Sequence, residues 1–147
     1  MAASKFFPMS EDIVDLILDV MKDDTPYLAT LGLDFTYLGV AKQPSIIKVS
    51  KIAPIAEYLI EKETIVITIY EQAFEMLTPE YKKMVIAHAL NSIEYDSDKD
   101  KLNIRGNGGT AIDEGIYNKY KETSVLAVFA GEHAIRQIEE DKKKDKQ

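Results

Sequence analysis

Cysteine is absent from this chain of 147 residues. Its absence fits a reducing compartment, and it excludes a disulfide framework, a thiolate metal site and a cysteine nucleophile. Histidine is almost as rare, with only His88 and His133 available as a general base, and no G-x-S-x-G elbow is present. The arrangements used by serine and cysteine hydrolases are therefore missing. The stretch RGNGGT, residues 105–110, matches neither common phosphate-binding loop, so its turn chemistry predicts an ordinary connection.

Long apolar runs are lacking too. The longest run near the C-terminus, VLAVFAG, is far shorter than the ~20 residues of a membrane-spanning helix. The opening residues, MAASKFFPMSED, lack the basic start and the apolar segment of a signal peptide. We therefore expect a cytoplasmic protein without a membrane partner.

Acidic residues outnumber basic ones, which gives a formal net charge of -7 at pH 7. Direct binding to nucleic acid requires a basic face, so this charge argues against it. An acidic protein can instead imitate DNA, and the stretch SEDIVDLILDVMKDD, residues 10–24, gives that hypothesis local support. The solvated face of an amphipathic helix explains the same charges more simply.

The order of the periodic segments predicts an α+β fold in one domain, residues 1–140, followed by a charged, disordered tail, residues 141–147. Ser10 predicts the start of a first helix that ends near Asp24, because Pro26 follows. Three strands are expected, in a small sheet that packs against helices: DFTYLG from Asp34, IIKVSKI from Ile46 and TIVITIY from Thr64. The third is apolar on both faces and is predicted to lie in the sheet interior, with the second on the outside.

After the strands the apolar period changes to that of a helix. Thr78 and Pro79 form a strong helix start, which predicts a largely buried helix from Pro79 to about Tyr95. The polar segment at residues 96–111 is expected to be a loop. Two further helices are expected at about residues 112–122 and 124–140.

The predicted helix from Pro79 carries MVIAHALNSIEYD, in which one H-E-x-x-H frame reads His88, Ala89 and Ser92 at the three fixed positions. One histidine cannot hold a catalytic zinc ion, which needs three protein ligands. A buried histidine with a hydrogen-bond partner is therefore the simpler interpretation. Spacing alone also leaves open a rearranged site built from His88, His133 and either Asp113 or Glu114.

The order of elements, the turn LTPE at Leu77–Glu80 and the later stretch TAIDEG at Thr110–Gly115 together resemble the zincin-like metallopeptidases encoded by bacteriophages. The resemblance extends from about Ile13 to Tyr120. It implies a zincin-like fold around a former active-site helix. It also implies that His88, Ala89, Ser92 and Thr110 occupy the positions of the metal ligands and the general base. Only His88 matches, so neither zinc nor peptidase activity is carried over, and we expect no cofactor.

We therefore expect a non-catalytic pseudo-metallopeptidase, encoded by a phage, that binds a bacterial host protein and inhibits or redirects it. Two contact surfaces are expected: Tyr81 and Tyr95 beside the former cleft, and Glu11, Asp12 and Asp15 on the first helix. Two alternatives stay open at this point. One is a metal-dependent hydrolase with the rearranged site, and the other is an acidic mimic of DNA.

Overall fold

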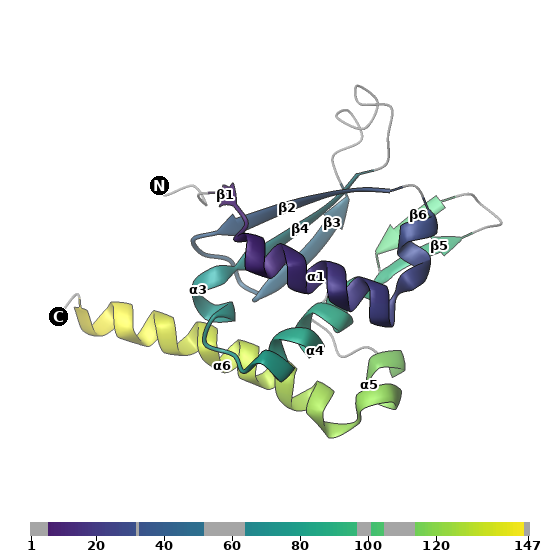
Figure 1. Ribbon diagram of the computed structural model, residues 1–147. Coiled ribbons are helices and arrows are strands. Elements are labelled where there is room, and N and C mark those ends of the chain that lie inside the picture. The colour runs from purple at the N-terminus through teal and green to yellow at the C-terminus, as the bar shows by residue number, and fades with distance from the viewer. Residues whose placement is uncertain (1–5, 32, 52–63, 97–100, 105–113, 146–147) are drawn as a thin grey trace.

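The computed structural model describes residues 6–31, 33–51, 64–96, 101–104 and 114–145 (Figure 1). A four-stranded sheet forms one layer, and the helices lie together on one of its faces. The predicted α+β class, with a small sheet packed against helices, is confirmed. The elements in chain order are β1 (Phe6–Pro8), α1 (Glu11–Asp24), the 3-10 helix η1 (Pro26–Thr30), β2 (Asp34–Val40), β3 (Ile47–Lys51), β4 (Thr64–Tyr70), α3 (Glu71–Phe74), α4 (Pro79–Leu90), β5 (Ile93–Asp96), β6 (Lys101–Ile104), α5 (Glu114–Tyr120) and α6 (Glu122–Asp145).

The sheet has the order β1-β2-β4-β3, in which β2 and β4 are parallel and the other pairs are antiparallel. The three predicted strands are present, with the third in the interior and the second at an edge. A fourth strand, β1, was not predicted because three residues are too few to show a period. Ile65, Ile67 and Ile69 of β4 are fully buried and form the centre of the core.

Helix α1 has the predicted bounds, but its start is held differently from the expectation. The Ser10 carbonyl accepts hydrogen bonds from the amides of Ile13 and Val14. The Ser10 hydroxyl donates to the carboxylate of Glu71 instead of capping the helix. Ile13, Ile17 and Val20 are buried at the spacing of one helix face. Helix α1 therefore covers the core, with its polar side toward solvent.

Helix α4 starts as predicted and ends early. Thr78 Oγ1 accepts a hydrogen bond from the Tyr81 amide at 3.3 Å, and Pro79 occupies the first turn. The predicted end at Tyr95 is wrong, because the helix stops at Leu90. Residues after it form β5, which pairs antiparallel with β6. Strand β6 lies in the segment that was predicted to be a loop, so that prediction is wrong for Lys101–Ile104.

The C-terminal helix is longer than its pattern indicated. Helix α6 continues to Asp145, past the expected end at Glu140, and it includes most of the segment predicted to be a disordered tail. It packs on α4, α3 and α5. Lys121, between α5 and α6, has a φ of 56°, in the left-handed region. No helix in the described ranges is long and apolar enough to cross a membrane.

Candidate functional site

His88 lies near the end of α4 and is buried between two helices. Its side chain is 1% exposed, and Nε2 is 3.1 Å from the carbonyl oxygen of Ser124 at the start of α6. A carbonyl oxygen only accepts hydrogen bonds, so Nε2 carries the proton and donates it. A protonated ring nitrogen has no lone pair for a metal. The interpretation of His88 as a buried, hydrogen-bonded histidine is confirmed.

The other two positions of the motif, Ala89 and Ser92, offer no metal ligand of the usual kind. Ala89 is fully buried and has no group that could accept a proton. Ser92 lies beyond the last residue of α4, and its hydroxyl donates to the Ala89 carbonyl. Within the described ranges, no three His, Cys, Asp or Glu residues are grouped so that they could hold a metal ion. The side chains described at these positions therefore do not fit zinc.

Some residues of the expected site fall outside the part that the structure describes. Thr110 and Asp113 lie in residues 105–113, and Glu114 is described only as the first residue of α5. His133 is exposed on α6, nine positions after Ser124, which corresponds to about 13 Å along the helix axis. The two histidines of the rearranged site are thus not brought together.

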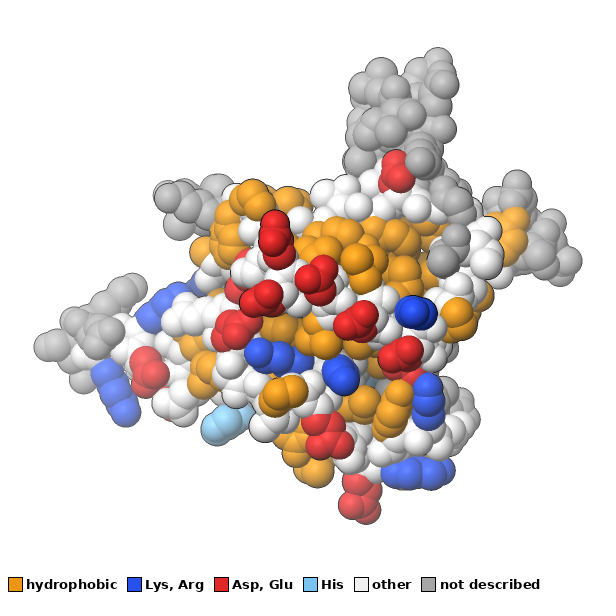
Figure 2. Space-filling model, viewed as in Figure 1, with side chains coloured by type: hydrophobic (Ala, Val, Ile, Leu, Met, Phe, Trp, Pro, Cys, Tyr) orange, Lys and Arg blue, Asp and Glu red, His pale blue; other side chains and the backbone are white. Residues whose placement is uncertain are grey.

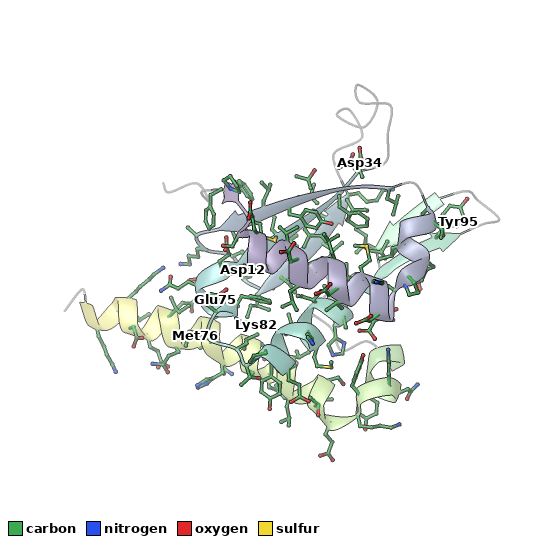
Figure 3. The ribbon with its side chains drawn as sticks, in the orientation of Figure 1. Asp12, Asp34, Glu75, Met76, Lys82 and Tyr95 are labelled. Atoms are coloured by element: carbon green, nitrogen blue, oxygen red, sulfur yellow. The ribbon has the colours of Figure 1, made fainter. Side chains whose placement is uncertain are left out.

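The aromatic contact surface that we expected beside the former cleft is divided. Tyr81 is partly buried against the core, whereas Tyr95 is 43% exposed on β5. Figure 3 places Tyr95 on the hairpin, away from Lys82 in the first turn of α4. The expectation of one flank shared by both tyrosines is wrong, because it depended on a helix that continues to Tyr95.

The exposed side of α1 carries a row of carboxylates. Glu11, Asp12 and Asp15 are exposed, as are Asp19 and Asp23 further along the helix. Figure 2 shows the acidic side chains gathered over α1. Three of these residues are the acidic contact residues predicted from the sequence, and they do share one exposed surface.

Asp24 at the end of α1 differs from the other acids of that helix. It pairs with Lys119, and it accepts a hydrogen bond from the Tyr120 hydroxyl at 2.6 Å. Burial and this hydrogen bond both raise the pKa of Tyr120, and the bond to Asp24 likewise raises the pKa of Lys119. Asp24 therefore joins α1 to α5 and is not part of the free acidic row.

One groove was not predicted from the sequence: it is lined by residues of β2, β3 and β4, and Glu139 of α6 borders it. Its volume is about 780 Å³. Thr68 at its floor donates from Oγ1 to Gln43 Oε1 at 3.0 Å. Lysines stand at its edge, which is unusual in so acidic a chain: Lys42, Lys48 and Lys51. The alternation of apolar and polar residues in β3 was the available signal, because it places Lys48 opposite the buried Ile47 and Val49.

Comparison with known proteins gives one match. A family model described as "Putative phage metallopeptidase" matches residues 7–126, from β1 to the first turn of α6. A search of curated proteins and a search of solved structures each found no match. The matched region contains α4 and the motif positions His88, Ala89 and Ser92, and it covers most of the chain. The chain therefore belongs to the putative phage metallopeptidase family.

Proposed function

We propose that this chain is a non-catalytic member of its family that binds a bacterial host protein and inhibits or redirects it. The observation that carries the proposal is the state of His88, whose Nε2 donates to the Ser124 carbonyl in a buried position. That contact uses the one side chain that matches the family's metal ligands. His88 then has a structural role, because it joins α4 to α6.

The neighbouring positions support the same proposal. Zinc-dependent peptide hydrolysis needs three protein ligands, an open position for water and a base. Ala89 replaces the base by a methyl group, and the Ser92 hydroxyl is already bonded to a backbone carbonyl. Apolar and short polar side chains at these positions leave no unpaired ligand in the interior, which favours a stable fold without metal. A stable scaffold with this content is suited to binding.

The acidic row on α1 is the surface that we assign to the partner. Its carboxylates are exposed, and the chain as a whole carries a formal charge of -7. A field of one sign raises the association rate with a partner of opposite sign. We therefore expect a host protein with a basic surface. Tyr95, exposed on β5, is a second contact that could anchor the complex.

Capture from bacterial lysate with matched charge variants tests this proposal. The test variant is Asp12→Asn, Asp15→Asn, Asp19→Asn, and the control Glu80→Gln, Glu132→Gln, Glu139→Gln removes the same charge from exposed positions elsewhere. We expect the wild type and the control to capture the same host protein. The α1 variant should bind it on the order of tenfold more weakly. Equal capture by both variants, or no specific partner at all, contradicts the proposal.

The acidic row also favours a second candidate, an acidic mimic of DNA. In that case the captured protein would be a nucleic-acid-binding protein. Duplex DNA would compete with the chain for it, more strongly the more tightly the captured protein binds DNA. Binding would weaken steeply with salt, because the groove of such a protein is built to meet phosphates. A partner that DNA does not displace excludes this candidate and leaves the leading proposal intact.

A further inference from the structure

Helix α6 has an outer face that does not contact the rest of the described chain. Its buried residues, among them Ala127, Ala134 and Ile138, face the molecule, where α4 and α3 pack against it. On that inner side Gly131 lies against Ile46, which directly precedes β3. The exposed positions of the opposite face follow one another at steps of four, three, four, three and four residues: Glu122, Leu126, Phe129, His133, Arg136 and Glu140.

This spacing is that of a heptad repeat, in which one stripe of a helix packs against another helix. In the N-terminal half of the stripe Leu126 is 51% exposed and Phe129 is 55% exposed. Single exposed apolar residues are common, but two large ones in adjacent positions of a heptad stripe form a continuous apolar strip. Glu122 stands at one end of that strip and His133 at the other, and Arg136 and Glu140 lie beyond His133. The stripe therefore has the composition of a short helix–helix interface.

We propose that this stripe, which we call the α6 seam, is an interface between two copies of the chain, with the two α6 helices antiparallel. In an antiparallel pair, the first heptad position of one helix meets the fourth position of the other. Leu126 then lies opposite Phe129 of the partner subunit. The same register places Glu122 opposite His133 of the partner subunit, and the two-fold axis repeats both contacts.

Charge complementarity selects this arrangement over a parallel one. A parallel pair would place Glu122 against Glu122 of the partner subunit and Arg136 against its own copy, and like charges across a helix pair are destabilising. The antiparallel register places an acid opposite an imidazole. Beside the seam, Glu132 meets Val125 of the partner subunit rather than another acid. The surface is thus complementary to itself, as a two-fold interface requires.

The seam is independent of the proposed function. The family match ends at Leu126, so Phe129 and His133 lie outside the matched region. The seam has two apolar layers only, whereas stable protein interfaces bury about 1,200–2,000 Å². We therefore expect a weak dimer, with a dissociation constant between roughly one and several hundred micromolar.

Cysteine cross-linking tests the register directly, because the chain has no cysteine of its own. Two variants, Glu122→Cys and His133→Cys, are prepared and oxidised separately and as a mixture. Opposed positions meet the Cα separation of below about 7 Å that a disulfide needs. Residue 122 and its own symmetry mate are displaced by about 16 Å along the axis. We expect a disulfide dimer in the mixture and almost none in either variant alone.

The control mixture is Glu139→Cys with His133→Cys, because Glu139 is exposed on α6 but lies outside the seam. Equal yields in the control and test mixtures, or a dimer of Glu122→Cys alone, overturn the proposed register. Sedimentation equilibrium tests the interface itself. The wild type should associate with concentration, and Leu126→Glu, Phe129→Glu should remain monomeric with an unchanged thermal melt. A wild type that is monomeric at several hundred micromolar overturns the proposal.

Discussion

Buried polar side chains in this chain are held mainly by backbone carbonyls of nearby helices. His88 donates to the Ser124 carbonyl, Ser92 donates to that of Ala89, and the Ser124 hydroxyl donates to that of Lys121. A buried polar group without a partner costs about 1–3 kcal/mol, so these contacts stabilise the fold. Two buried atoms have no hydrogen-bond partner among the described residues: the Tyr70 hydroxyl and Glu71 Oε2.

Tyr70→Phe should therefore raise the free energy of unfolding, by about 1 kcal/mol. Tyr70 is 1% exposed, and the substitution removes only the oxygen that has no partner. At a position where the hydroxyl was hydrogen-bonded, the same change would lower stability by a similar amount. Urea unfolding at neutral pH measures the sign. Tyr117→Phe, the same change on an exposed side chain, is the control and should alter stability by less than about 0.5 kcal/mol.

The pH dependence of the same variant gives an independent readout. Burial, with a smaller contribution from Glu139, raises the pKa of Tyr70 above its ordinary value of 10.0. Below that value the phenol is neutral in both the folded and the unfolded chain. Above it the unfolded chain loses the proton first, so stability falls as pH rises toward the folded-state pKa. Tyr70→Phe should reduce this alkaline loss, and a loss as steep as in the wild type contradicts the assignment.

At the scale of elements, helix starts were easier to predict than helix ends. The start of α4 depends on local chemistry, because Thr78 and Pro79 act within one turn of the chain. Its end depends on residues far along the sequence. The segment after Leu90 forms β5 because β6 is there to pair with it, and β6 came from a stretch whose polar composition indicated a loop. A period cannot report a strand partner that lies outside its window.

The distinction between local chemistry and contacts far along the sequence also explains how much of the candidate site could be predicted. The loss of the expected base at Ala89 and of one expected ligand at Ser92 was readable from residue identity alone. The burial of His88 followed from the apolar surroundings of its helix. Its partner, the carbonyl of Ser124, was not predictable, since any residue type could supply that atom. The separation of Tyr81 from Tyr95 was not predicted, because the helix was expected to continue to Tyr95 and instead ends at Leu90.

Thr78→Ala should lower the free energy of unfolding by about 1 kcal/mol. The substitution removes the acceptor of the Tyr81 amide. That amide is one of the donors at the start of α4 that have no acceptor within the helix itself. Thr78→Ser keeps that acceptor and should stay within a few tenths of a kcal/mol of the wild type. Thermal melts measure both, and hydrogen exchange of the first turn of α4 locates the effect. Equal losses in the two variants would mean that the methyl group, and not the cap, matters.

At the scale of the whole molecule, the helix that carries the motif, α4, lies in the middle of the structure. Helix α4 contacts α1 and β3, and it packs against α6. Its residues from Met84 to Leu90 are buried without a break. An active-site helix normally exposes one turn to a substrate cleft, whereas here α6 covers the turn that carries His88 through the contact at Ser124. Under the proposed non-catalytic role, this burial gives the motif positions a part in the stability of the fold.

The proposed non-catalytic role predicts that the chain is stable without metal, and this can be measured on the intact chain. A ligand that binds only the folded state at one hundred times its dissociation constant adds about 2.7 kcal/mol, which in a chain of this size raises the melting temperature by roughly 5–10 °C. We expect protein purified without a histidine tag to contain far less than one zinc per chain. We also expect its melting temperature to be unchanged by chelator or by added zinc. The His88→Ala variant separates the two explanations of any shift, because the loss of a structural histidine lowers the melting temperature equally with and without zinc. A zinc-dependent increase that His88→Ala abolishes would instead assign His88 to a metal site and withdraw the proposed non-catalytic role.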